Sequence, residues 1–360
     1  MPHQDLPRFR DSVKAYERWL AGQLKGDLWK NDLDDKHEKM RDSPFVFLRA
    51  TYWRWAETIL TICGDLATAP IVGGVGDIHL ENYGVWRDQE GRLVWGVNDF
   101  DEAADMPCAV DVVRLATSAI LSRSARRKER RAICASVLEG YREGLKGPRP
   151  FSLDEDHVWL RRLFVVSENE RRRFWKKMNR LKDDTRIPAK YRKAMESRMP
   201  GDDADVEKFA RRAAGTGSLG RPRWVAVVQW RGGRLVREAK ALVPSAWHLT
   251  HQPRPQPRPA ASIATGRHRA PDPWYYADTT LVVRRLSPNA RKIEVREQPD
   301  RLADPDMIRA MGHELANVHL GTGDAGRAIA KDLERRDGRW LERATDTAAD
   351  FVRADYEEWR

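Results

Sequence analysis

The chain has 360 residues, of which 41% are hydrophobic, and a formal net charge of +11 at pH 7. This length allows a large core in two lobes. Its three cysteines are widely spaced and fit neither a zinc site nor a disulfide framework, so we expect a reducing, cytoplasmic location.

Membrane and nucleic-acid roles are not favoured. The N-terminus has no apolar signal region, and no apolar run approaches the roughly 18 residues that a membrane span needs. The basic charge would suit a nucleic acid, but the basic residues form helical clusters mixed with acids and no nucleic-acid module is recognisable. Solvated helix faces are the favoured interpretation.

Residues 11–66 are predicted to be helical, and the apolar run from Phe45 to Ile62 predicts a single core helix. Arg49 lies inside that run. A buried arginine needs a carboxylate or a phosphate, and a structural ion pair is the more common explanation.

A polar cluster follows the short apolar run 71–75. Its members are Asp77, His79, Glu81 and Asn82. Next come two predicted strands, Tyr83–Trp86 and Leu93–Val97, joined by a turn. This hairpin should return Asp99 and Asp101 to the cluster. Carboxylates and a carboxamide are oxygen ligands that suit Mg²⁺ and its bound phosphates better than zinc.

The spacing of these residues resembles the catalytic core of protein kinases and aminoglycoside phosphotransferases. That resemblance implies that Asp77 orients the acceptor hydroxyl, whereas Asn82 and Asp99 bind the magnesium ion that bridges the nucleotide phosphates. The alternative is that each residue only caps a turn.

Asp111 opens the apolar segment that continues to about residue 123, and it is a natural helix cap. In the resembling superfamily an aspartate after the metal motif braces the catalytic loop, so Asp111 is assigned a supporting role. Charge-rich helical sequence is predicted to continue to about residue 210.

A glycine-rich segment begins at Gly215 and matches G-x-G-x-x-G. A strand pair follows it, 224–230 and 235–242, whereas a dinucleotide fingerprint would need a helix. Glycine loop, strand, turn and strand is the order of a kinase flap. The residues expected to contact nucleotide phosphates are Gly215, Gly217, Ser218, Gly220 and Lys240. Lys240 could also be a solvated edge residue, but the upstream flap favours phosphate binding.

In this chain the catalytic-loop motif precedes the glycine loop, whereas in an ordinary kinase the glycine loop comes first. We therefore expect an α+β, kinase-like fold with circularly permuted lobes. The predicted parts are a helical catalytic-loop lobe (1–210), a β-rich nucleotide-gripping lobe (211–300) and a closing helical segment that packs on the first lobe (301–360). Residues 251–273 hold six prolines and are expected to form a mobile, dispensable loop. A helix should run from Pro305 to Gly321, with His319 as a core or capping residue.

Seven motifs together resemble the bacterial family catalogued as domain of unknown function 2252. They are SPFVFLR (43–49), GDIHLENYG (76–84), NDFDEA (98–103), DVVRLATS (111–118), GTGSLG (215–220), EAKALVPS (238–245) and LANVHLGTGD (315–324). Two positions depart from the family pattern: Ala50 replaces a glycine, and Ala241 replaces a glutamate directly after the strand lysine. No carboxylate partner for Lys240 is evident.

The expected function is ATP- and Mg²⁺-dependent phosphoryl transfer to a small acceptor. His79, Asp101 and Arg49 are possible accessory residues. Three alternatives stay open: nucleotidyl transfer on the same parts, a non-catalytic nucleotide-binding or scaffolding protein, and a metal-dependent hydrolase. The hydrolase would use Asp77, His79, Asp99 and Asp101 but leave the glycine loop without a purpose.

Overall fold

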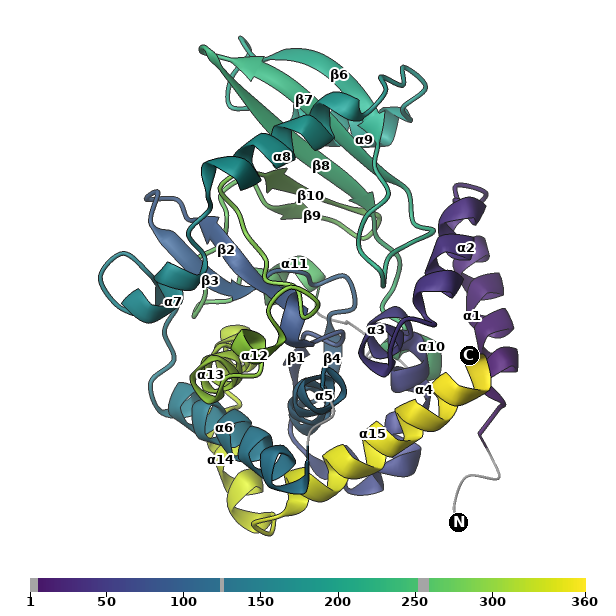
Figure 1. Cartoon of the computed structure of the whole chain (residues 1–360), viewed down its shortest axis with the longest axis vertical. Coiled ribbons are helices and arrows are strands. Elements are labelled where there is room, and N and C mark those ends of the chain that lie inside the picture. Colours follow the sequence, from purple (N-terminus) through teal and green to yellow (C-terminus); the bar gives the residue numbers. More distant parts are fainter. Residues whose placement is uncertain (1–5, 124–125, 252–258) are drawn as a thin grey trace.

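The computed structural model describes residues 6–123, 126–251 and 259–360 as a mixed helix and sheet protein, in which a five-stranded sheet stands on a mainly helical body (Figure 1). The helices are α1 (Phe9–Leu24), α2 (Lys30–Lys39), α3 (Pro44–Ala50), α4 (Tyr52–Ile62), α5 (Cys108–Leu121), α6 (Arg127–Lys146), α7 (Val158–Leu163), α8 (Glu168–Arg180), α9 (Ala189–Glu196), α10 (Trp247–Thr250), α11 (Ala260–Ala264), α12 (Pro299–Leu302), α13 (Pro305–Gly321), α14 (Gly326–Arg335) and α15 (Trp340–Trp359), with 3₁₀ turns η1 (Gly64–Thr68) and η2 (Leu80–Asn82). The strands are β1 (Ile71–Gly74), β2 (Tyr83–Arg87), β3 (Leu93–Val97), β4 (Ala104–Pro107), β5 (Phe151–Ser152), β6 (Asp205–Arg211), β7 (Arg223–Trp230), β8 (Gly233–Ala241), β9 (Tyr276–Ala277) and β10 (Leu281–Leu286).

The large sheet is antiparallel, in the order β6-β7-β8-β10-β9. Alternation along a strand sends every second residue to one face. On β8 the residues of one face are Val236, Glu238 and Lys240. The apolar end of this face packs beneath α8 through Met178, whereas its charged end lies toward the helical body. The sheet therefore presents buried charges to the region where the two parts meet.

Two small sheets frame the polar cluster in the helical body. Strand β1 pairs with β4, and β2 pairs with β3 in the hairpin that the sequence predicts, with Tyr83 opposite Val97. Helix α5 lies beneath them and is buried along its whole length. The polar cluster therefore sits on a rigid, fully covered support.

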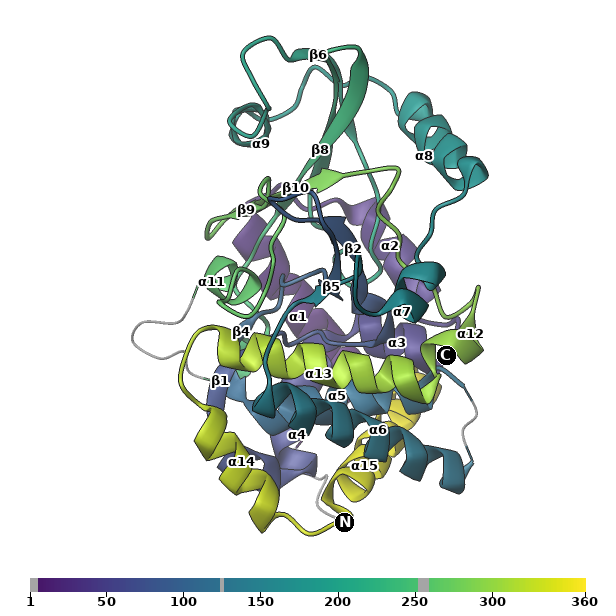
Figure 2. The same cartoon turned by 90° about the vertical axis from the view of Figure 1, so that its left-hand side faces the viewer.

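Helices α6 and α13 lie side by side (Figure 2), and α13 also packs on β1. Their backbones meet at glycines: a Cβ built on Gly140 would lie 1.8 Å from the Arg309 carbonyl oxygen, and one on Gly312 would lie 2.4 Å from that of Val137. This contact requires the absence of side chains at both glycines.

The predicted start of a helix at Pro305 is confirmed. Helix α13 begins at Pro305, and the side chain of its N-cap residue Asp304 accepts a hydrogen bond from the Asp306 amide. The last helix, α15, packs on α1, α3 and α5. Within the described ranges, no helix is both long and apolar enough to cross a bilayer.

Other predictions are wrong in their details. The single helix expected from Phe45 to Ile62 is two helices, because the chain bends at Thr51, whose hydroxyl donates to the Phe47 carbonyl. The segment 205–211, expected to be helical, is strand β6.

The described part of the proline-rich segment also differs from the expected mobile loop; residues 252–258 lie outside the described ranges. Residues 260–264 form α11, in which Ile263 is buried, and Arg269 forms an ion pair with Glu314. The Trp86 indole donates to the Ala270 carbonyl. Proline density did not reveal these isolated anchoring residues.

Candidate functional site

Asp77 is placed by a tightly held turn after β1. Gly76 has φ +76°, and a Cβ there would lie 2.2 Å from the Glu102 carbonyl oxygen, so only glycine fits. The Asp111 carboxylate accepts hydrogen bonds from the amides of Val75 (2.7 Å) and Gly76 (3.1 Å). Asp111 therefore braces this turn, as expected, but it lies inside α5 and does not cap it.

Asp111 is itself held by His319, whose Nε2 lies 3.1 Å from its carboxylate. The His319 Nδ1 bonds to the Tyr141 hydroxyl at 2.7 Å, and all three side chains are buried. His319 is thus a core residue that connects α13 to the Asp77 turn.

The Asn82 carboxamide joins the turn to the segment after β3. Its Nδ2 donates to the carbonyls of Asp77 (3.2 Å) and Asp99 (3.0 Å), and its Oδ1 accepts from the Asp99 amide at 2.9 Å. This arrangement makes Asn82 a brace between two aspartates. One lone pair of its oxygen remains for a metal, and that role stays a prediction.

Asp77 has a cationic partner that the sequence analysis missed. Arg114, fully buried on α5, donates from Nη2 to Asp77 Oδ1 and to the Leu48 carbonyl (2.9 Å). Its guanidinium carbon also lies 5.0 Å from the ring centroid of Tyr52 and 5.1 Å from that of Trp55. Burial raises the pKa of Asp77, and Arg114 opposes this by lowering it, with a net upward shift. The available signal was an arginine in a helix whose other residues, apart from Asp111, are uncharged and mostly apolar.

Lys240 reaches from β8 into the same group of carboxylates. Its buried ammonium lies 3.1 Å from Asp99 Oδ2 and also forms an ion pair with Asp101. The expected proximity of Lys240 and Asp99 is confirmed, and the partner that could not be located is this aspartate pair.

The pKa values of the two aspartates are shifted in opposite directions. Burial favours the neutral form of both. Lys240 and Arg284 lower the pKa of Asp99 well below its ordinary value despite burial, whereas burial and the neighbouring charge of Asp99 raise the pKa of Asp101 to about 6. Asp99 is therefore the more strongly anionic of the two.

The glycine loop reaches down from the sheet to α3 (Figure 1). A Cβ on Gly217 would lie 2.9 Å from the Arg49 carbonyl oxygen and 3.3 Å from Asp77 Oδ2. Gly215 and Gly220 have φ values of +78° and +90°. Lys36 donates to the Gly217 carbonyl at 3.3 Å, and burial lowers the pKa of Lys36 to about 8. The loop therefore covers Asp77 closely.

Glu102 anchors both ends of the β7–β8 hairpin to the Asp99 segment. Its carboxylate accepts from Arg221, at the exit of the glycine loop, and from the Ala246 amide (2.7 Å) after β8. The Ser245 hydroxyl donates to the Glu102 carbonyl at 2.8 Å. The hairpin and the Asp99 segment are thus fixed to one buried residue.

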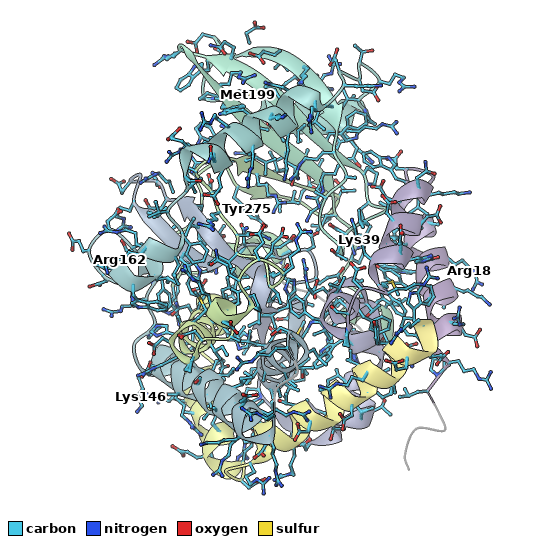
Figure 3. All side chains as sticks on the ribbon, viewed as in Figure 1. Arg18, Lys39, Lys146, Arg162, Met199 and Tyr275 are labelled. Atoms are coloured by element: carbon cyan, nitrogen blue, oxygen red, sulfur yellow. The ribbon has the colours of Figure 1, made fainter. Side chains whose placement is uncertain are left out.

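Two cavities meet at this site. A small one contains Asp77 and its aromatic neighbours Tyr16, Tyr52 and Trp53. A larger one, about 430 Å³ in volume, extends beyond Asp99 beneath the charged face of the sheet. Tyr275 lines it and lies where the sheet meets the helical body (Figure 3).

The residues shared by both cavities are Arg49, Asp99, Gly215 and Lys292. Arg49 forms the expected ion pair, 2.6 Å from Glu81. Removal from water and the nearby Arg284 lower the pKa of Lys292 to about 8. Lys292 was not singled out from the sequence, and nothing in its local pattern distinguishes it.

His79, an accessory candidate, is buried in the Asp77 cavity. Its Nδ1 accepts from the Glu81 amide at 3.1 Å, and burial lowers its pKa well below the ordinary value. His79 is therefore neutral near pH 7.

A family described as an uncharacterized protein conserved in bacteria (DUF2252) matches residues 30–186 and 163–360. The chain belongs to this family. Searches of curated proteins and of solved structures found no match. In this DUF2252 protein, buried Ala241 stands where the glutamate after the strand lysine was expected, and Lys240 binds Asp99 and Asp101.

The DUF2252 site holds no metal-binding cluster of three or more His, Cys, Asp or Glu side chains in the described part of the chain. Mg²⁺ bound with a nucleotide commonly takes only one or two carboxylates and completes its shell with phosphates and water. The donor set around Asp99 fits that mode of binding, and it does not fit a metal held by protein alone.

Proposed function

We propose that this DUF2252 protein is an ATP- and Mg²⁺-dependent phosphotransferase with a kinase-like, permuted arrangement, acting on a small acceptor that carries a hydroxyl group. One observation carries the proposal: Lys240 and Asp99, 141 residues apart in sequence, pair beneath a glycine loop that lies against Asp77. Phosphoryl transfer needs these parts together: an anion for the metal, a cation and backbone amides for phosphates, and a carboxylate for the acceptor.

The cavity suits a nucleotide in size and donors. About 430 Å³ lies within the range of small-molecule sites, roughly 300–1,000 Å³. The Asp99 side chain is 31% exposed and anionic, so it would hold the metal, while Lys240 and the glycine-loop amides would hold phosphates. Bound Mg·ATP would supply the transferable phosphoryl group and neutralise its charge.

Asp77 is suited to orient an acceptor hydroxyl and take its proton. Arg114 binds one carboxylate oxygen and fixes the side-chain direction, while the other oxygen faces Gly217. The raised pKa of Asp77 brings it closer to the working pH, which favours a general base. Asn82 ties the backbone of Asp77 to that of Asp99.

The test compares Asp77→Asn, Asp99→Asn and a control, Asp350→Asn, whose side chain is 72% exposed on α15. Asp99→Asn should weaken magnesium-dependent ATP binding, because it removes a charge from the metal site. Asp77→Asn should leave ATP affinity nearly unchanged while turnover falls by about 10² or more. Calorimetric titration measures binding, and mass spectrometry of a metabolite extract incubated with enzyme and Mg·ATP detects products.

The outcome separates the alternatives. A phosphorylated metabolite with ADP supports the proposal, whereas a nucleotidylated one with pyrophosphate indicates nucleotidyl transfer. ATP binding without any product indicates a non-catalytic nucleotide-binding protein. Equal loss of ATP affinity in both site variants would contradict the assigned division of roles.

A further inference from the structure

The sheet forms one wall of the large cavity, and this wall carries an unusual excess of positive charge. In the V-A-I-K pattern of kinases an alanine stands two residues before the strand lysine. Here that position is Glu238, fully buried and surrounded by arginines. Its carboxylate accepts from Arg223 Nη1 (2.9 Å), from Arg284 Nε (2.8 Å) and from Arg212. Three guanidiniums therefore share one carboxylate.

Strand register explains why these charges meet. Arg284 on β10 lies directly opposite Glu238 on β8, and Arg223 on β7 lies directly opposite Lys240. Like charges placed opposite each other destabilise a sheet. Lys240 is neutralised by the two aspartates, but the arginine cluster has only Glu238. The excess positive charge is thus built into the rigid strands.

This excess faces the cavity. Arg212, Arg223 and Arg284 all line it, and the side chains of Arg212 and Arg284 are 27% and 21% exposed. Lys292 lines it too and has no ion-pair partner among the described residues. The other cations of the lining have partners of their own: Arg49 binds Glu81, Arg269 binds Glu314, Arg285 binds Asp272 and Arg291 binds Glu170.

The position of the cluster connects it to the glycine loop. The Arg212 amide donates to the Arg223 carbonyl at 3.0 Å, which closes the base of the loop. Arg223 Nη2 also donates to the Ser218 hydroxyl at 2.7 Å. Lys292 and Gly215 line both cavities, so the cationic surface continues from the sheet to the cavity that contains Asp77.

We propose that Arg212, Arg223, Arg284 and Lys292 form a binding site for a chain of two or more phosphates. Guanidiniums bind phosphate oxygens in pairs of hydrogen bonds. Guanidinium N–H donors held on rigid strands therefore suit a polyanion better than the flat, apolar base of a nucleotide. The inference rests on the proposed function in assigning these phosphates to the nucleotide, and it moves most phosphate recognition from Lys240 to the arginines.

The experiment measures binding without turnover. Sodium tripolyphosphate is titrated calorimetrically into the full chain without magnesium at constant ionic strength, with ATP, adenosine and sulfate in parallel. The variants are Arg212→Gln, Arg284→Gln and Lys292→Gln. The control is Arg231→Gln, at the turn of the same sheet, whose side chain is 70% exposed.

Each cavity variant should weaken tripolyphosphate binding by about tenfold or more, and Arg231→Gln by less than about twofold. ATP should follow the same pattern, and adenosine and sulfate should bind far more weakly. Lys292→Gln leaves no carboxylate unpaired, so it remains informative if an arginine variant fails to fold.

Several results would overturn the inference: no binding of tripolyphosphate, equal affinity in Lys292→Gln and Arg231→Gln, or adenosine binding as tightly as tripolyphosphate. Failure of the proposed function is distinguishable from this. Tripolyphosphate would then bind with the expected variant pattern, while no ATP is consumed with any extract.

Discussion

The glycine contact between α6 and α13 leads to a quantitative prediction for Gly140→Ala. The new Cβ would lie 1.8 Å from the Arg309 carbonyl oxygen, whereas ordinary contact begins near 3.4 Å, so the helices must separate by about 1.6 Å. The obstacle is backbone, which cannot rotate away. Overpacking of this kind costs about 1–3 kcal/mol, and we expect the upper part of that range. Improved helix propensity offsets about 1 kcal/mol. The net loss should be about 1–2 kcal/mol.

The matched control is Gly22→Ala in α1, where nothing lies within 4 Å of the added Cβ. It should be neutral or stabilising by up to about 1 kcal/mol. Gly144→Ala, with 2.6 Å to the His313 carbonyl oxygen, should lie between the two. Urea denaturation followed by tryptophan fluorescence gives each free energy of unfolding, with the slope expected to be unchanged. If Gly140→Ala is as stable as Gly22→Ala, the close backbone contact is not present.

Three further predictions concern the site and the cysteines. Gly217→Ala should push the glycine loop off the Arg49 carbonyl and lower turnover by about tenfold, with little change in melting temperature. Gly233→Ala should keep full turnover, because the nearest atom to its added Cβ, the Trp230 carbonyl oxygen, is 4.0 Å away. Equal activities of the two variants would contradict the loop placement. Arg114→Met should raise the pKa of Asp77 further, so activity is lost on the acid side at a higher pH; an unchanged pH profile would exclude Arg114 as its partner. Burial raises the pKa of each of the three thiols to about 12, so Ellman's reagent at pH 8 should find none in the native protein and three after unfolding; rapid native labelling would show that a thiol is accessible.

The hairpins of this fold were predicted well from the sequence, because residues close together in the chain determine them. Alternation and turn residues were enough to place β2–β3 and β7–β8, and the capping pattern placed the start of α13. The break at Thr51 was missed because the apolar pattern continues through it. Periodicity describes which face is buried, and it does not report a change of helix direction.

The candidate site was predictable only in part, for a related physical reason. The motif residues Asp77, Asn82 and Asp99 are close in sequence, and a hairpin brings them together. The Arg114 pairing with Asp77 depends on how α5 packs beneath the turn. The arginine cluster depends on the register of three strands, which a single sequence does not specify for distant partners.

The anchoring of both hairpin ends on Glu102 limits how this protein can open. A rotation of the whole sheet about a flexible hinge would have to break the Arg221, Ser245 and Ala246 contacts together. The segment between Arg212 and Arg221 is free of that restraint at its tip, where Gly217 lies on Arg49. A ligand should therefore enter the cavity that contains Asp77 through a short movement of the glycine loop, while the hairpin ends stay fixed at Glu102. Backbone hydrogen exchange should accordingly be faster at 213–219 than along β7 and β8.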